Sequence, residues 1–499
     1  MPVARARWWR FAAFLLCCFV AIAGVPWLVD AFDGPRVAPR QLARTIVQWS
    51  AGQNPAAAQF GEAIGATLMR MDRGVAQTPE QSIFRIGAQV QTRHAQPTPP
   101  TPDRTIGDAV IVVASSAEAI LALARANPGD VITFEPGVYR FSGSRIAVSR
   151  PGSAHQPIVV RADRAGTVTL EMTTVEGFLV SAPSWRFENL TITGVCADHS
   201  SCEHAFHIVG GATGFVARNN TISDFNAHFK INAIDDIAPD GGLIEANTLT
   251  NRSVRRTGNP VTPIDLVVAS HWTIRKNLIT DFIKGAGNRI SYGAFAKGGG
   301  SDTVFENNII LCEHLLRTTG VQTVGLSLGG GGTGAQFCLD RRCDSEQDRG
   351  SIRGNLIASC SDSGIYLNKA SNSNIVHNTL LDTGGIAVRF ASSSALVEGN
   401  LVDGQIRSSE GATMRMVDNI DTSTLRLFLG SHPVMNLFDA QGLTVAGKDL
   451  PRRAAAGADV PDLCGAATGT SRVYGAFENF AGCRQSAPSV SSQRAAPRD

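Results

Sequence analysis

A surplus of charge of one sign is what this 499-residue sequence most clearly lacks. Its 45 basic and 43 acidic residues leave a formal net charge of +2, which gives no electrostatic reason to expect a nucleic-acid partner. Charged residues of both signs make up only 18% of the chain, whereas glycine occurs 50 times. This composition favours turns and closely stacked strands over long solvated helices.

The four consecutive glycines in GLSLGGGGTGAQFCLDRRC (325–343) lack the lysine that a phosphate-binding loop requires. In such a loop Lys-Ser or Lys-Thr follows the glycines, so that backbone N–H groups and the lysine converge on the anion. Here Thr333 and Gly334 follow instead. We therefore interpret the run as a close-packed turn or loop that leaves the fold and shapes a groove, where missing side chains let the backbone approach another coil or an extended ligand.

Residues 1–29 have the pattern of an export signal. Three arginines precede an apolar run from Phe11 to about Val25, and Ala21-Ile22-Ala23 supplies a small-x-small cleavage site. Because the apolar character continues past Pro26 to Val29, an uncleaved membrane anchor is the alternative interpretation. We expect a periplasmic or secreted protein, anchored in the inner membrane if the segment is not cleaved.

Eight cysteines lie outside this segment, and an even number at short spacings in an exported chain predicts disulfides. The sequence does not prove their connectivity. The natural local pairs are Cys196–Cys202, Cys338–Cys343 and Cys464–Cys483. Cys312–Cys360 is then assigned only by elimination.

The chain divides into a helical part and a longer strand-rich part. Residues 30–105 combine alanine-rich helical spacing from Gln41 to Met71 with a proline-rich linker at 91–105. Ser115-Ser116-Ala117-Glu118 is a capping box that predicts a short amphipathic helix. Short strands follow it. We expect the strand-rich domain to span 106–448, with a C-terminal cap and disordered tail at 449–499.

A repeated phrase organises the strand-rich part. An asparagine stands just before an apolar pair at intervals of 27, 30 and 31 residues, and later of 23 and 22 residues. Periods of this length indicate stacked supersecondary units. The phrases are FENLTI (187), RNNTI (218), EANTL (245), RKNLI (275), ENNII (306), RGNLI (353), VHNTL (376) and EGNLV (398).

These repeats predict an all-β fold, a right-handed single-stranded parallel β-helix with an N-terminal capping helix. Asparagines stacked in successive coils about 4.8 Å apart can hydrogen-bond along the stack and satisfy polar groups at the turns. Their expected role is therefore structural. The interval from Asn308 to Asn355 is 47 residues, so we expect it to hold a coil and a long excursion that bulges outward.

The entry segment carries a family resemblance. The stretches SSAEAILALARANPGDVITFEPGVYR (115–140), GSAHQPIVVRA (152–162) and WRFENLTITG (185–194) resemble the parallel β-helix polysaccharide lyases of the chondroitinase B and alginate lyase type. The resemblance supports the fold over roughly Ile111 to Val417. It implies eliminative cleavage of an acidic polysaccharide by a lysine and an arginine on adjacent coils. It also implies a metal ion, a divalent cation such as calcium, that neutralises the substrate carboxylate.

Elimination from a uronic-acid polymer needs a base for the C5 proton and a cation that stabilises the developing enolate. Where the family has its lysine, this chain has VVASHW with His271, and where the arginine is expected it has Lys297. Lys369 holds a strand-to-turn position similar to that of Lys297. The predicted catalytic residues are Lys297, Lys369, Tyr366 and His271, and the predicted substrate-binding residues are Arg389, Arg289, Lys230 and Asn368.

Other interpretations of the same residues remain open. The lysines can be solvated strand ends, or they can form a basic stripe that binds an acidic glycan without catalysis. A non-catalytic glycan-binding or cell-envelope structural protein is therefore the alternative function. A uronate epimerase would share the fold, but its Asp-Pro-His-Asp motif is absent.

The metal ligands are not assigned by the sequence. CADHSSCEHAFH (196–207) holds the ligand types of a zinc site, and CEH recurs at 312–314. A disulfide would remove both thiolates of the first segment. The adjacent Asp235 and Asp236 offer poor support for a glycosidase carboxylate pair, because neighbouring strand residues point to opposite faces.

Overall fold

The computed structural model describes residues 38–51, 53–73, 110–330, 334–438, 450–454, 460–465 and 469–478. The expected export segment at 1–29, the linker at 91–105, the tail beyond 478 and Cys483 lie outside these residues. Within the described residues, no helix is both long enough and apolar enough to span a membrane.

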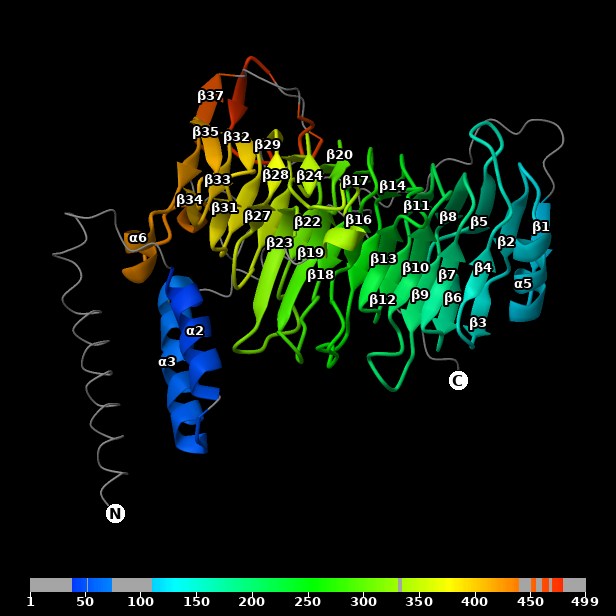
Figure 1. Ribbon diagram of the computed structural model, residues 1–499, viewed down its shortest axis with the longest axis horizontal. Coiled ribbons are helices and arrows are strands. Elements are labelled where there is room, and N and C mark those ends of the chain that lie inside the picture. Colours follow the sequence, from blue (N-terminus) through cyan, green and yellow to red (C-terminus); the bar gives the residue numbers. More distant parts are fainter. Residues whose placement is uncertain are drawn as a thin grey trace, which may run out of the picture.

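Three long parallel sheets, stacked coil upon coil, form a right-handed parallel β-helix (Figure 1). Each complete coil contributes one strand to each sheet, which confirms the fold predicted from the repeats. The strands of sheet A are β1 (Val110–Val113), β2 (Val131–Phe134), β5 (Ile158–Ala162), β8 (Trp185–Glu188), β11 (Val216–Arg218), β14 (Leu243–Glu245), β17 (Thr273–Arg275), β21 (Val304–Glu306), β25 (Ser351–Arg353), β29 (Ser373–Val376), β32 (Ser394–Glu398) and β35 (Thr413–Val417).

Sheet B continues each coil after a short turn that contains the repeated asparagine. Its strands are β3 (Gly137–Phe141), β6 (Val168–Met172), β9 (Thr191–Gly194), β12 (Thr221–Ser223), β15 (Thr248–Thr250), β18 (Leu278–Thr280), β22 (Ile309–Leu311), β26 (Leu356–Ala358), β30 (Thr379–Leu381), β33 (Leu401–Val402) and β36 (Ile420–Asp421).

Sheet C completes the coil and has the longest strands. They are β4 (Ile146–Val148), β7 (Glu176–Val180), β10 (His204–Val209), β13 (Ala227–Asn232), β16 (Ile264–Val267), β19 (Ile290–Lys297), β23 (Gln322–Leu328), β27 (Ile365–Asn368), β31 (Gly385–Arg389) and β34 (Gln405–Ser409). Two small sheets flank these three, and their strands are β20 (Gly300–Ser301), β24 (Gln347–Asp348) and β28 (Ala370–Ser371), and the antiparallel pair β37 (Arg452–Ala454) and β38 (Ser471–Val473).

Apolar side chains fill the interior of the coils in rows. The rings of Phe178, Phe206 and Phe229, from successive strands of sheet C, stack with centroids 5.3 Å apart. At the N-terminal end, helix α5 (Ser116–Arg125) covers the first coil with its buried Ala119 and Leu123. The Ser115 hydroxyl accepts a hydrogen bond from the Glu118 N–H at 3.2 Å, so the predicted capping helix begins where its sequence indicated.

The asparagine ladder forms as predicted and stabilises the turn between sheets A and B. Each side-chain amide N–H donates to the Oδ1 of the asparagine in the next coil, at 2.9–3.1 Å. The ladder extends to Asn419, which the repeat analysis missed. Asn189 of FENLTI is not a member of the ladder. The position that precedes Asn220 in the ladder is held by Leu190, whose backbone N–H donates to Asn220 Oδ1. The ladder consists of Asn220, Asn247, Asn277, Asn308, Asn355, Asn378, Asn400 and Asn419.

We predict that Asn308→Ala destabilises the fold by roughly 2–4 kcal/mol, because buried donors and acceptors lose their partners. Asn308 Oδ1 accepts hydrogen bonds from the backbone and the side chain of Asn277, and its Nδ2 donates to the Ile274 carbonyl and to Asn355. Chemical denaturation measures the change. Asn374→Ala, at an exposed strand position, is the control, and equal effects of the two substitutions would contradict the ladder's role.

Three disulfides bond as predicted: Cys196–Cys202, Cys338–Cys343 and Cys312–Cys360. The expected partner of Cys464, Cys483, lies outside the described residues, so that pair stays a prediction. Disulfides of this kind are typical of proteins outside the reducing cytosol. The Asn308–Asn355 interval departs from the coil twice, at residues 312–321 and at 329–346, where a 3₁₀ turn, η1 (Ala335–Phe337), lies. The first two glycines of the run, Gly329 and Gly330, begin the second departure.

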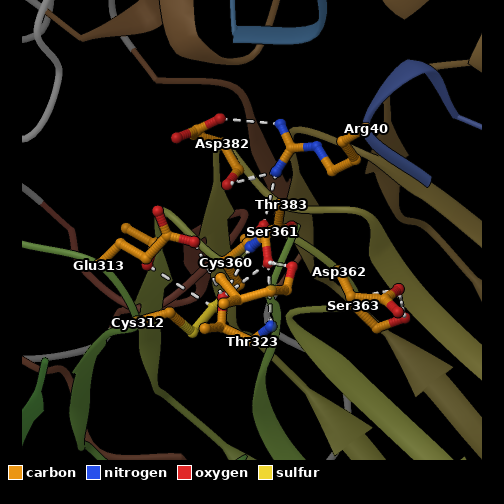
Figure 2. Close-up of a disulfide and its surroundings, with 12 residues drawn as sticks. Arg40, Cys312, Glu313, Thr323, Cys360, Ser361, Asp362, Ser363, Asp382 and Thr383 are labelled. Carbon is orange, nitrogen blue, oxygen red and sulfur yellow. Dashed lines mark hydrogen bonds and ion pairs between the residues drawn. A yellow bond between two sulfur atoms is a disulfide. The ribbon is translucent and has the colours of Figure 1, made fainter. Parts of the chain in front are cut away.

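Two N-terminal helices, α2 (Pro39–Ala51) and α3 (Pro55–Arg73), pack as a hairpin against the last coils (Figure 1). Short helices α6 (Thr424–Phe428) and η2 (Met435–Leu437) follow the coils. Arg40 of α2 is buried and fixes the hairpin. Its guanidinium donates to the carbonyls of Cys360 and Asp382 at 2.6 and 2.8 Å, and pairs with the carboxylates of Asp382 and Asp72. Figure 2 shows this guanidinium beside Asp382 and the loop that the Cys312–Cys360 disulfide secures.

Candidate functional site

The outward face of sheet C collects most of the predicted site residues. The parallel register places one row of side chains across successive strands and a second row two residues further along each strand. The first row is His207, Lys230, Asp265, Phe295, Ser327, Tyr366, Ala387 and Arg407. The second row includes Asn232, Val267 and Lys297, and then, on the later strands, Asn368, Arg389 and Ser409.

Two clefts open on this face. The lysine cleft has a volume of about 640 Å³ and lies between sheet C and the loop that the Cys338–Cys343 disulfide closes. Its lining includes Lys230, Asn232, Asp235, Asp236, Lys297, Phe337, Leu339 and Arg341. The arginine cleft has a volume of about 1000 Å³, and its lining includes Gln41, Arg44, Tyr292, Tyr366, Asn368, Arg389, Arg407 and Glu410. Gln41 and Arg44 belong to α2, so the N-terminal hairpin forms one wall of the arginine cleft.

Lys297 is the central group of the lysine cleft. Its Nζ lies 4.2 Å from the centroid of the Phe295 ring, and none of the described residues forms a hydrogen bond or ion pair with it. Burial lowers the pKa of the Lys297 ammonium, while the Asp265 carboxylate opposes that shift and the Lys230 charge adds to it. Lys230 is engaged, because its Nζ donates to Asp265 Oδ2 at 2.9 Å. Lys297 is thus an amine with a lowered proton affinity that faces open space.

The first two glycines of the run, Gly329 and Gly330, lie close to Asn368 and Lys297. At Gly329 the backbone has φ 69°, and a Cβ there would lie 1.8 Å from the Asn368 carbonyl oxygen. A Cβ on Gly330 would lie 2.8 Å from Lys297 Cδ. The interpretation of these glycines as a close-packed loop that shapes a groove agrees with this geometry, and the Cys338–Cys343 disulfide closes the loop beyond them.

Tyr366 is the central group of the arginine cleft. Its Oη accepts hydrogen bonds from Asn368 Nδ2 at 3.1 Å and from Arg389 Nη1 at 3.2 Å. Burial raises the pKa of the Tyr366 hydroxyl, and the Arg389 charge opposes that shift. Because both neighbours donate, the phenolic proton of Tyr366 is free to point into the cleft. Arg389 also pairs with Glu410.

Arg407 and Arg44 line the same cleft and were not predicted from the sequence. Burial lowers the pKa of the Arg407 guanidinium, which forms no hydrogen bond or ion pair within the described part of the chain. Arg44 pairs with Asp362 at 2.8 Å. The outward direction of Arg407 follows from strand alternation, but no local motif marks its strand. Nothing in the sequence places Arg44 near residues some 320 positions away.

Three predicted residues line neither cleft. His271 is an exposed turn residue whose Nδ1 lies 3.7 Å from Asp302 Oδ2, and Arg289 precedes β19 and donates to the Thr319 carbonyl at 2.6 Å. Lys369 lies one residue beyond the position of Lys297, since β19 ends at Lys297 and β27 ends at Asn368. Lys369 follows it with φ 57° and donates to the Cys343 carbonyl at 3.2 Å. Lys230, Lys297, Tyr366, Asn368 and Arg389 do share the face.

The described residues contain one group of metal-ligand type, formed by Glu176, His204 and His207. Calcium takes six to eight oxygen ligands, whereas this group offers one carboxylate and two imidazoles. The calcium expected from the family resemblance therefore does not fit it. The thiolates of CADHSSCEHAFH are consumed by the Cys196–Cys202 disulfide. Asp236 pairs with Arg341 at the mouth of the lysine cleft, so Asp235 and Asp236 form no isolated carboxylate pair.

Comparison with known proteins bears on the architecture. The family model described as right-handed beta helix region matches residues 176–402. Among solved structures, pectate lyase Pel9A is similar at 14% identity and a TM-score of 0.46, over 76% of this chain and 97% of that one. An alginate lyase from Paenibacillus sp. str. FPU-7 has 14% identity and a TM-score of 0.33, over 63% and 99% of the two chains. No curated protein matches the sequence.

The A-module of the mannuronan C-5 epimerase AlgE4 from Azotobacter vinelandii is also similar, at 12% identity and a TM-score of 0.40, over 62% of this chain and 92% of that one. At such identities nothing follows about the chemistry of the two clefts. That chemistry has to be argued from the side chains of sheet C.

Proposed function

We propose that this protein is an exported enzyme that cleaves an acidic, uronic-acid polysaccharide by β-elimination, with the polymer lying across the strands on the outward face of sheet C. The observation that carries the proposal is Lys297, whose amine pairs with none of the described residues and lines a cleft beside a second, arginine-lined cleft on the same face. A flexible anionic polymer can contact both clefts at once, because the sheet aligns their cationic groups in rows.

In the proposed reaction, neutral Lys297 removes the C5 proton of a uronate. The electrons of the C5–H bond form the C4–C5 double bond, the C4–O4 bond breaks, and the departing oxygen takes a proton from the Lys297 ammonium or from water. The lowered pKa of Lys297 increases the fraction of neutral amine near neutral pH. Lys230 supplies positive charge close to the developing enolate.

The arginine cleft is proposed to bind neighbouring sugars of the same chain. Guanidinium groups match the geometry of carboxylates, and Arg407 is available because no described residue pairs with it. Tyr366, held by Asn368 and Arg389, can donate its proton to an oxygen that enters the cleft. The aromatic ring of Tyr292 adds an apolar surface for a sugar face.

Incubation with a panel of uronic-acid polymers tests the proposal. We expect a new ultraviolet-absorbing unsaturated product from at least one polymer and none from the same polymer after its carboxyl groups are reduced to alcohols. Saturable binding without any product would favour the glycan-binding alternative. The absence of both binding and product across the panel would overturn the assignment to acidic polysaccharide.

A further inference from the structure

The cluster of Glu176, His204 and His207 lies where β7 and β10 pair on the sheet C face, next to the lysine cleft, whose Asn232 contacts His207. The register places His204 directly beside Glu176 on the neighbouring strand. His207 lies three residues further along β10, and its ring centroid is 5.2 Å from that of His204. One ligand atom from each of the three residues lies within 4.8 Å of the others.

The hydrogen bonds of His207 leave a place for a cation. Asn232 Nδ2 donates to the Ala233 carbonyl at 3.0 Å, so its Oδ1 faces His207 Nε2, at 2.8 Å, and Nε2 must carry the proton of a neutral ring. The unprotonated Nδ1 then faces Glu176 Oε1 at 2.8 Å. At this distance the lone pairs of Nδ1 and Oε1 require a positive charge between them, which is either a second proton or a metal ion.

His204 provides an independent observation. Its Nδ1 is buried and has no hydrogen-bond partner among the residues that the structure describes, although buried polar atoms are nearly always satisfied. A third ligand in this position would meet the same ion as Glu176 and His207. The neighbouring Cys196–Cys202 disulfide holds the segment that leads into β10, so the two histidines are presented by a braced strand rather than by a loose loop.

We propose that Glu176, His204 and His207 bind a divalent transition-metal ion of the zinc class. Two imidazoles and one carboxylate suit zinc and exclude calcium as the preferred ion. Asn232 acts as the outer partner that fixes the His207 tautomer, as carboxylates and carbonyls do around other metal-bound histidines. The site does not depend on the proposed lyase function. It uses two of the three histidines of CADHSSCEHAFH, with a carboxylate from the preceding coil in place of the thiolates.

Zinc titration of the chelator-treated full-length protein tests this site. We expect one zinc ion per chain by calorimetry and by metal analysis after dialysis, a higher melting temperature with zinc, and visible absorption bands of bound Co²⁺. Calcium at the same concentration should produce none of these changes. Asn232→Ala should weaken zinc binding about 10–100-fold, and His204→Ala or His207→Ala should weaken it further.

Glu176→Gln keeps the size of the side chain and should also lose tight binding, which separates ligand loss from misfolding. His155→Ala, at an exposed turn outside the cluster, is the matched control and should bind zinc as the wild type does. Zinc affinity unchanged in a folded His204→Ala/His207→Ala double variant would overturn the site. So would tighter binding of calcium than of zinc by the wild type.

Discussion

Lys297→Ala is expected to lower kcat on a confirmed uronic-acid substrate by roughly two to four orders of magnitude, with a much smaller change in KM. The amine is proposed to act on the C5 proton only in the transition state, so its loss removes little of the ground-state binding. If Lys297 only contributed charge to a glycan-binding surface, its removal would instead weaken substrate affinity, and added salt would have the same effect. Initial rates over a range of substrate concentrations separate the two results.

Lys369→Ala is the matched control. This lysine lies one residue beyond the Lys297 register and its Nζ donates to the Cys343 carbonyl, so we expect turnover close to that of the wild type. Full activity in Lys297→Ala would remove Lys297 from the mechanism, and Tyr366 would then be the next candidate base. If Lys369→Ala lowered turnover as much as Lys297→Ala does, the position of the loop around Cys343, and not the Lys297 amine, would control turnover.

The pH profile gives the Lys297 assignment a second readout. Burial lowers the pKa of this lysine, and only the neutral amine can accept the proton. Activity should therefore rise with pH through the lowered pKa and level off at a lower pH than an exposed lysine would require. Lys297→Arg keeps the charge but should remain inactive across this range, because a guanidinium stays protonated.

The coil architecture was predictable because a short local sequence pattern specifies each coil. Each asparagine before an apolar pair marks one turn, and stacking identical turns requires contacts only between neighbouring coils. The five residues that share the sheet C face were predictable for a related reason, since strand alternation and a common register align them. Asn189 and Lys369 show the limit of this reasoning, because a one-residue offset within a coil changes which side chain occupies a row.

The remaining site residues depend on contacts that no local pattern reveals. Arg44 reaches the arginine cleft only because α2 docks on coils more than 300 residues away in sequence. Glu176 joins His204 and His207 because an entire coil separates them in sequence but one strand spacing separates them in space. The thiolate ligands that the sequence offered for a metal are consumed by a disulfide, and the carboxylate comes from outside the motif.

Arg40→Met is expected to destabilise the docking of the α2–α3 hairpin by roughly 3–5 kcal/mol, because it leaves buried carboxylates without their guanidinium. Arg40 is fully buried between Asp72 and Asp382, and it also holds the Cys360 carbonyl (Figure 2). Loss of docking would remove one wall of the arginine cleft. Hydrogen exchange of α2 and its susceptibility to protease report the change directly.

Arg44→Met provides the control on the same helix, one turn later. Its ion pair with Asp362 is partly exposed, and such pairs contribute only about 0–1 kcal/mol. We therefore expect α2 to stay protected in Arg44→Met while KM for the acidic polymer rises, because the cleft loses a cation but keeps its wall. In Arg40→Met the rise in KM should come together with rapid exchange of α2. Equal protection of α2 in the two variants would show that Arg40 does not fix the hairpin, and would leave the wall of the cleft to the apolar contacts of Ala43 and Val47.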